Sequence, residues 1–209
     1  MRRSTLSLMA LSLSLLVAPA FADVIPYPNA GHVAPTTSVT ATGNTLDIYF
    51  YGSSAADTDK IKVQDVTQGW TSGLILDNHS TAFGQEFSFS VNPGDVLVFY
   101  LVNQTTGQTY SSDPAGSADG YNHAYITAFS GSGGIPAGTF VGFEDLYIGA
   151  NRDGVCGGAG NQSDCDYNDD EFIFVGVDPA PAPEPSSLAL LGTSILGAAG
   201  MMRRRFVRR

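Results

Sequence analysis

The sequence predicts an all-β fold, a single jelly-roll-like β-sandwich over residues 23–177. Apolar side chains in this region alternate with polar ones or form short runs, which is typical of strands. Outside the two chain ends, no window shows the 3.6-residue period of a helix. The 24 glycines and two lysines also disfavour a helical bundle. Aromatic residues make up 11% of the chain, enough to close a core.

Four segments have the clearest strand pattern, with alternation or β-branched and aromatic residues. They are 45–51, 60–66, 86–91 and 95–102. Asn92-Pro93-Gly94 separates the last two and predicts a turn, because Gly tolerates the positive φ that many turns need. Further strands are predicted at 38–42, 124–129, 139–143 and 171–177. Eight short strands joined by Gly-rich turns indicate a sandwich.

The first 22 residues have the three parts of a secretory signal peptide. Arg2 and Arg3 give a positive start, residues 6–17 are apolar, and Ala20-Phe21-Ala22 fits a cleavage site. The apolar run is shorter than the ~20 residues that cross a bilayer as a helix. We therefore expect cleavage after Ala22 and an exported protein.

The C-terminal end has three parts in order. Residues 178–185 form a proline-rich linker, which cannot become helical. Residues 186–202 carry no charge and are just long enough to cross a bilayer as a helix. Five arginines within residues 203–209 follow, and the positive-inside rule would keep them in the cytoplasm. A transmembrane helix with a cytoplasmic tail is the expected structure.

Charge separates an acidic middle from basic ends. All 20 acidic residues lie between Asp23 and Glu184, where only three of the ten Lys and Arg residues lie, so this stretch has a formal charge of −17. Such a chain repels phosphate groups, which excludes nucleic acid as a partner. The basic ends are interpreted as addressing signals.

The C-terminal end resembles the PEP-CTERM sorting signal of Gram-negative bacteria. The resemblance rests on Pro183-Glu184-Pro185, the short apolar segment and the Arg-rich terminus, in that order. It implies passage through the export machinery and transient membrane insertion. An exosortase, a membrane protease, would then cut near the motif. The protein would reach the cell surface or the medium, where such proteins usually accompany exopolysaccharide in a biofilm.

The two cysteines, Cys156 and Cys165, lie in one loop of an exported chain. A disulfide is the expected state in that compartment. A catalytic or zinc-binding pair is disfavoured because no histidine is near in sequence. The bond would close a ring of ten residues.

The acidic loop, residues 144–171, is the part of the sequence with recognisable site chemistry. Five carboxylates fall between Asp164 and Glu171, and they repel one another unless they face solvent or bind a cation. Calcium accepts six to eight oxygen ligands from such side chains. Asp164, Asp166 and Asn168 match the opening of a calcium loop, but Asp169 stands where an EF-hand requires Gly. A solvated acidic loop and another metal remain alternatives.

Pairing between the predicted strands 139–143 and 171–177 would complete this site. Such a hairpin would bring Glu144 and Asp145 beside residues 166–169. We therefore expect carboxylates from both sides of the loop to converge.

Two segments together resemble an uncharacterised domain common in PEP-CTERM proteins. They are Gly142-Phe-Glu-Asp-Leu146 and Asp164-x-Asp-Tyr-Asn-Asp169, followed by an apolar strand. The longer loop at residues 149–163 departs from the usual pattern. The resemblance implies a β-sandwich with a calcium site and no known catalytic activity. By position, the implied metal ligands are Glu144, Asp145, Asp164, Asp166, Asn168 and Asp169.

The leading hypothesis is an exported protein with a structural calcium site, associated with the exopolysaccharide of a biofilm matrix. The alternative is a calcium-braced carbohydrate-binding module that displays Trp70 or one of the tyrosines at 110, 121, 125 and 147. A secreted hydrolase is least favoured, because nucleophilic catalysis needs an oriented base, and His32, His79 and His123 stand in unremarkable Thr-, Ser- and Asn-rich settings. We expect no enzyme.

Overall fold

The computed structural model describes residues 25–158, 160 and 162–179. The predicted signal peptide, the sorting motif, the segment 186–202 and the Arg-rich end lie outside the described residues. Within the described ranges, no helix is long and apolar enough to cross a membrane.

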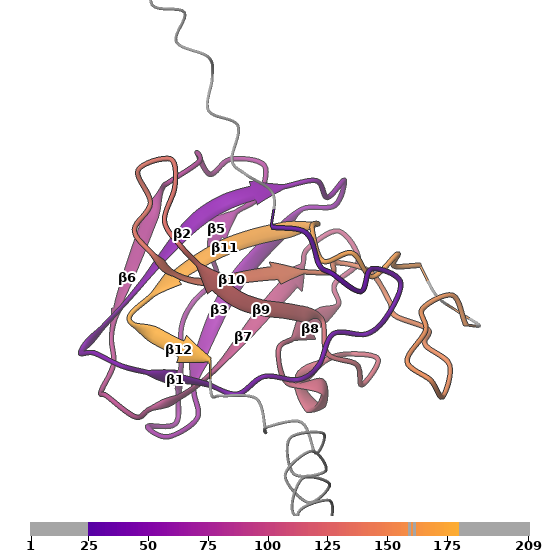
Figure 1. Ribbon diagram of the computed structural model, residues 1–209, viewed down its shortest axis with the longest axis horizontal. Helices are drawn as coiled ribbons and strands as arrows, with labels where there is room; N and C mark the ends of the chain where they lie inside the picture. Colours follow the sequence, from indigo (N-terminus) through magenta and orange to yellow (C-terminus); the bar gives the residue numbers. More distant parts are fainter. Residues whose placement is uncertain (1–24, 159, 161, 180–209) are drawn as a thin grey trace, which may run out of the picture.

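Two antiparallel sheets make up the structure (Figure 1). A 7-stranded sheet has the order β12 (Val177–Pro179), β1 (Val39–Ala41), β7 (Val96–Asn103), β3 (Asp59–Asp65) and β4 (Trp70–Thr71), with β5 (Ile75–Asp77) on β3 and β8 (Thr109–Ser111) on β7. A 5-stranded sheet has the order β6 (Glu86–Ser90), β2 (Thr45–Ser53), β11 (Asp170–Val175), β10 (Gly138–Phe143) and β9 (Ala124–Phe129). A short 3₁₀ helix, η1, covers Pro114–Gly116. The all-β prediction is confirmed and the arrangement fits a β-sandwich, while the jelly-roll-like connectivity stays a prediction.

Strand alternation places the core between the two sheets. Along β7 and β3 every second residue is buried, as expected of strands with one face turned inward. Phe99 of β7 contacts Phe174 of β11 across the sandwich, with ring centroids 4.1 Å apart. Both rings are fully buried, and each such side chain stabilises the fold by roughly 1.5–3 kcal/mol.

All eight predicted strands are present, but the last prediction, 171–177, is wrong as a single strand. β11 ends at Val175, and Val177–Pro179 form β12 in the other sheet. Gly176 is the reason: its φ is 89°, and a Cβ there would lie 2.2 Å from the carbonyl oxygen of Thr45. Only glycine allows the chain to cross between sheets here. Strand β12 therefore includes Asp178 and Pro179, which were predicted to belong to the proline-rich linker.

The acidic loop lies on a small hydrophobic cluster of its own, outside the main core. Residues 25–35, here called the N-terminal strap, run beside the loop at the right of Figure 1. Tyr27 of the strap contacts the rings of Tyr125 and Tyr167, with centroids 4.8 and 4.9 Å away. Ile148 and Cys165 complete the cluster, and both are fully buried. The strap thus anchors the loop to the 5-stranded sheet.

Candidate metal centre

The hairpin predicted from the sequence is confirmed. β10 pairs with β11 in antiparallel register, with Phe143 opposite Asp170. Glu144 and Asp145 therefore leave β10 at the point where Asp169 enters β11. The strand register brings the two ends of the acidic loop together.

Three carboxylates converge in this loop. Glu144, Asp164 and Asp166 each place one oxygen within 4.8 Å of the other two. Glu144 is fully buried, Asp166 is half-buried and Asp164 is exposed. The cluster therefore has a closed inner end and an end that is open to solvent.

Glu144 is held in place by two hydrogen bonds. The hydroxyl of Ser163 donates to one carboxylate oxygen, and the backbone N–H of Tyr167 donates to the other. Burial, together with the negative charge of Asp169, raises the pKa of Glu144 to about 8 in spite of these bonds. The Glu144 carboxylate thus accepts two hydrogen bonds, but no positively charged side chain of the described residues pairs with it. A bound cation would supply the missing positive charge.

Asp166 is oriented by its neighbour in the loop. The side-chain amide of Asn168 donates to Asp166 Oδ2 at 2.5 Å, and the Asn168 Oδ1 accepts from Ser54 at 2.7 Å. Burial and the charge of Asp164 raise the pKa of Asp166. Asn168, a predicted ligand, instead links Asp166 to the end of β2 in this structure.

Asp145 and Asp169 lie beside the three-carboxylate cluster. The backbone N–H of Asp145 donates to Asp169 Oδ2 at 3.0 Å, which fixes the two residues to one another. Burial raises the pKa of Asp145 to about 6 and that of Asp169 to about 7. Of the six predicted ligands, the structure thus gathers Glu144, Asp164 and Asp166 and places the other three next to them.

The loop holds two backbone conformations that residues other than glycine rarely adopt. Cys165 has φ 56° and Tyr167 has φ 58°. Such positions cost about 1–3 kcal/mol each and persist where surrounding contacts fix them. The N–H of Tyr167 that reaches Glu144 depends on this conformation. Strain in the loop therefore accompanies the placement of the cluster.

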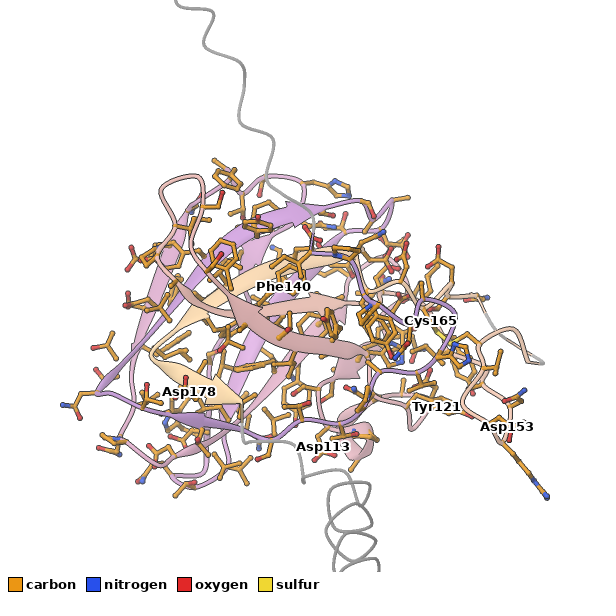
Figure 2. All side chains as sticks on the ribbon, viewed as in Figure 1. Asp113, Tyr121, Phe140, Asp153, Cys165 and Asp178 are labelled. Atoms are coloured by element: carbon orange, nitrogen blue, oxygen red, sulfur yellow. A yellow bond between two sulfur atoms is a disulfide. The ribbon has the colours of Figure 1, made fainter. Side chains whose placement is uncertain are left out.

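The predicted disulfide between Cys156 and Cys165 is confirmed. Cys165 stands between Asp164 and Asp166 in the chain, so the bond ties the middle of the cluster to residue 156, nine positions earlier in the same loop. Backbone hydrogen bonds add the N-terminal strap: Gly31 donates to Cys165 at 3.1 Å and accepts from Cys156 at 2.8 Å. Figure 2 shows Cys165 beside the strap.

The donors suit a hard divalent cation. Every side-chain atom that the cluster offers is a carboxylate oxygen, which fits calcium better than zinc or copper. Among residues 25–158, 160 and 162–179, the ion pairs join Lys60 to Asp77 and His123 to Asp119, and neither reaches the cluster. Within these ranges, no positively charged side chain neutralises the three acids.

Sequence analysis missed the groups that hold the ligands. Ser163, Ser54 and the backbone N–H of Tyr167 have no motif of their own, since serines occur throughout the chain. One signal was available: Gly142 in the Gly-Phe-Glu-Asp-Leu segment. A Cβ there would lie 2.2 Å from the carbonyl oxygen of Tyr167, so glycine permits close contact between β10 and the loop.

His123, one of the three histidines considered for a hydrolase, lies inside the fold beside the acidic loop. It is fully buried and stacks on Tyr110 at 4.1 Å between ring centroids. One ring nitrogen lies 3.0 Å from the carboxylate of Asp119 and the other 3.0 Å from the backbone oxygen of Glu144. Both nitrogens are engaged, so the residue braces the start of the acidic loop.

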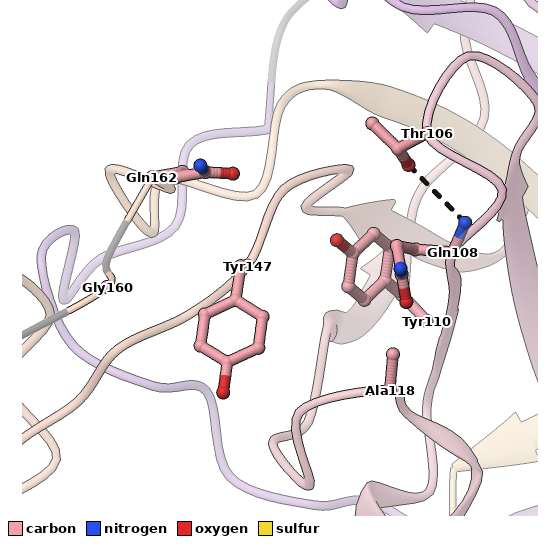
Figure 3. Close-up of a pocket in the computed structure, with 7 residues that line it drawn as sticks. All are labelled: Thr106, Gln108, Tyr110, Ala118, Tyr147, Gly160 and Gln162. Carbon is pink, nitrogen blue, oxygen red and sulfur yellow. Dashed lines mark hydrogen bonds between the residues drawn. The ribbon is translucent and has the colours of Figure 1, made fainter.

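A groove opens beside the acidic loop. Figure 3 shows its lining: Thr106, Gln108, Tyr110, Ala118, Tyr147, Gly160 and Gln162, around a volume of about 600 Å³. Tyr147 is 41% exposed, whereas Tyr110 is buried. Tyr121 and Tyr125 are half-buried against the small cluster, and Trp70 packs on Phe89. Tyr147 is therefore the one aromatic candidate of the sequence analysis that the described residues display openly.

Fold and site together describe two antiparallel sheets, an arrangement that fits a β-sandwich, with an oxygen-only cluster that could hold a metal ion. Comparison with known families identifies a sorting signal: residues 181–205 match the PEP-CTERM protein-sorting motif. This motif indicates export through the cell envelope to the surface, with an exosortase as processing partner. No curated protein and no solved structure matches the chain. The domain that residues 142–146 and 164–169 resemble was not found and stays a prediction.

Proposed function

We propose that this exported protein is folded around a structural calcium ion and belongs to the extracellular polysaccharide matrix of a Gram-negative bacterium. The sorting motif supports the export route. The calcium site and the matrix association are the proposed parts. One observation carries the calcium proposal, namely the convergence of Glu144, Asp164 and Asp166.

Electrostatics explain why a cation would matter to the fold. Two unit charges about 4 Å apart near a protein surface repel by ~4 kcal/mol. The disulfide and the strap keep the loop from spreading to relieve this repulsion. A calcium ion would turn the repulsion into shared coordination, with water or backbone oxygens completing the shell. Calcium fits better than magnesium, which demands a stricter octahedral geometry.

Thermal unfolding of the full chain tests the calcium proposal. The oxidised protein, in mild detergent, is melted in EDTA, in millimolar calcium and in millimolar magnesium, with the fluorescence of Trp70 as the signal. An ion at a thousand times its Kd stabilises the fold by ~4 kcal/mol, so calcium should raise the Tm by several degrees. Magnesium should raise it less.

Two variants connect that response to the cluster. Asp166→Asn keeps the shape of the side chain but removes a charged ligand, so bound calcium should fall by one ion per chain. Asp153→Asn is the matched control, because Asp153 is an exposed acid of the same loop outside the cluster. Melts that coincide in EDTA and calcium, with no bound ion, would reject the calcium site.

The sorting proposal is tested separately. Replacement of Pro183-Glu184-Pro185 by alanines should leave a larger precursor in the membrane fraction, because exosortase would no longer recognise the chain. The unchanged protein should appear at the surface or in the medium. Normal release of the variant would show that another signal directs export.

A second candidate function is carbohydrate binding at the groove. The observation in its favour is the exposed ring of Tyr147 between the amides of Gln108 and Gln162. Aromatic rings stack on sugar faces, and amides can bond hydroxyls. The test is affinity electrophoresis in gels that contain the host's exopolysaccharide. The polysaccharide should retard the Tyr147→Ala variant less than it retards the unchanged protein. Phe87→Ala is the control, because Phe87 is 42% exposed on β6, away from the groove.

We propose no catalytic role. Of the three histidines considered as a base, His123 is buried and uses both ring nitrogens within the fold. Incubation with the host polysaccharide should therefore release no reducing ends, and release that depends on the protein would contradict this part of the proposal.

A further inference from the structure

A second group of carboxylates closes one end of the core, next to the first cluster. Asp59 is the first residue of β3, and Asp170 is the first residue of β11. These strands belong to different sheets. Asn78 donates to Asp59 and to Ser53, the residue opposite Asp170 on β2. Asn103, opposite Asp59 on β7, donates to the carbonyl oxygen of Asp145 at 3.0 Å, which places Asp145 at the same end of the sandwich.

Strand alternation directs two of these acids into the sandwich. Asp59 shares its face of β3 with the buried Ile61 and Val63. On β11, Asp170 is in phase with Phe172 and Phe174, which belong to the same core. Both aspartates are 0% exposed. They face the interior from opposite sheets.

These buried acids have oxygens without a hydrogen-bond partner. Among the residues that the structure describes, none donates a hydrogen bond to either carboxylate oxygen of Asp170 or to Oδ1 of Asp59. Buried carboxylates in proteins are paired, hydrogen-bonded or bound to a metal. The open oxygens therefore point to a ligand that the polypeptide itself does not provide.

Neighbouring amides are already engaged elsewhere. The Asn103 side chain, at the end of β7, donates to Asp57 Oδ2 at 2.8 Å and to the Asp145 carbonyl at 3.0 Å. Asn78 donates to Asp59 Oδ2 at 3.4 Å, which leaves Oδ1 open. In the described part of the chain, no Lys, Arg or His side chain forms an ion pair with Asp59, Asp145 or Asp170.

We propose that Asp59, Asp145 and Asp170 bind a second hard divalent cation, most suitably calcium, which joins the two sheets at this end of the sandwich. The donors are carboxylate oxygens from β3, from β11 and from the start of the acidic loop, and all three residues are buried. Calcium suits such a site because it accepts many protein oxygens, whereas magnesium keeps several waters. This inference goes beyond the proposed function and does not depend on the first site.

Asp169 connects the two centres. It accepts the backbone N–H of Asp145, and its charge acts on Glu144 of the first cluster as well as on Asp59 of the second. The Asp169 carboxylate is therefore close enough to act electrostatically on both groups of acids.

Counting bound calcium tests the proposal. The oxidised full chain in mild detergent is dialysed to equilibrium against radioactive calcium, and ions per chain are measured. We expect two ions for the unchanged protein and one each for Asp170→Asn and Asp166→Asn. Asp65→Asn should keep two: Asp65 is equally buried on the same face of β3 and also has one oxygen without a hydrogen-bond partner, but it lies at the other end of the strand, away from Asp145 and Asp170.

The outcomes separate this inference from the proposed function. One ion that is lost in Asp166→Asn and kept in Asp170→Asn overturns the second site and leaves the first. One ion with the reverse pattern supports the second site and overturns the first. No bound calcium overturns both, and protons would then neutralise the buried acids.

Two further measurements protect the test against misfolding. In EDTA, Asp170→Asn should melt at a higher temperature than the unchanged protein, because a neutral amide replaces a buried carboxyl group that must either carry a charge or take up a proton, and calcium should then raise its Tm less. Terbium bound to the unchanged chain should show one emission lifetime with almost no H₂O/D₂O dependence, from a dry site. If every bound terbium ion instead retains water, and Asp59→Asn still binds two calcium ions, the proposal is wrong.

Discussion

The hydroxyl of Tyr167 accepts a hydrogen bond from the backbone N–H of Ala34 at 2.7 Å and donates one to the carbonyl oxygen of Asn122 at 3.0 Å. Asn122 in turn donates its side-chain amide to the Ala34 carbonyl at 2.9 Å. One tyrosine thus joins the N-terminal strap, the segment before β9 and the acidic loop. Its backbone N–H binds Glu144, so strap and cluster are held by the same residue.

Tyr167→Phe should weaken both the fold and the metal site. The substitution keeps the ring contact with Tyr27 but leaves the buried Ala34 N–H without an acceptor. Such a loss costs ~1–3 kcal/mol of unfolding free energy. Calcium affinity should also fall, because the loop that carries Glu144's donor becomes less fixed. Urea unfolding and calcium titration measure the two effects.

Tyr121→Phe is the matched control. Its hydroxyl donates to the Ala150 carbonyl at 3.1 Å, but the side chain is half-buried and water can replace the bond. We expect a change of less than ~1 kcal/mol and unchanged calcium affinity. Equal effects of both substitutions would show that Tyr167 has no special link to the site.

Gly142→Ala should displace the loop from β10. The added Cβ would lie 2.2 Å from the backbone oxygen of Tyr167, which cannot rotate away as a side chain could. Overpacking of this kind costs about 1–3 kcal/mol. We therefore expect a lower Tm together with weaker calcium binding.

Gly43→Ala provides the comparison for that substitution. A Cβ at Gly43 meets no atom within 4 Å, and its φ is not in the left-handed region. This variant should keep the Tm within about 2 °C and bind calcium normally. If Gly142→Ala behaved in the same way, the close contact with Tyr167 would be irrelevant to the site.

The strands were predictable because alternation depends only on neighbouring residues. The break after Val175 was not, because Gly176 acts through a contact with Thr45, far away in sequence. The strands β4, β5 and β8 have two or three residues each, too few to show a period. The pattern of neighbouring residues therefore predicted a sandwich but not the full order of its strands.

The first cluster was predictable because its acids are crowded in one motif and a hairpin. The second group was missed although a signal existed in the strand phase. Asp59 lies two residues before Ile61 on β3, and Asp170 lies two residues before Phe172 on β11. Each aspartate therefore occupies a position of its strand where an apolar residue is expected. Neither the partner strand nor the missing hydrogen bonds can be read from sequence. These depend on how the two sheets face one another.

Reduction of the disulfide should destabilise the protein and its metal site together. Cys156 and Cys165 are the chain's two cysteines, so a reductant acts on one bond. Loop-closure entropy for a ring of about ten residues predicts a loss of roughly 2.5–3 kcal/mol. Calcium affinity should fall as well, because Asp164 and Asp166 flank Cys165. Urea melts and calcium titrations with and without reductant measure both.

The double substitution Cys156→Ala, Cys165→Ala serves as the control for the reductant. Its stability should equal that of the reduced protein and should not change further when reductant is added. Unchanged calcium affinity after reduction would mean that the strap alone fixes the loop.

Metal-free protein should become less stable as the pH rises from 5 to 8. The pKa of Glu144 is raised from its ordinary value of 4.5 to about 8, mainly by burial. The folded protein therefore holds a proton that the unfolded chain has already lost, and stability falls with pH across this window. Asp59 and Glu171, with pKa values of about 7, act in the same direction.

Calcium should reverse this trend, because the ion replaces the protons on its ligands. The difference in Tm between calcium and EDTA should be small at pH 5 and should grow towards pH 8. Melts at pH 5, 6, 7 and 8 in both conditions measure it, with Glu144→Gln as the variant. Glutamine does not titrate, so the slope in EDTA should become shallower. A stability in EDTA that rises with pH over this range would show that these buried acids are ionised without a metal.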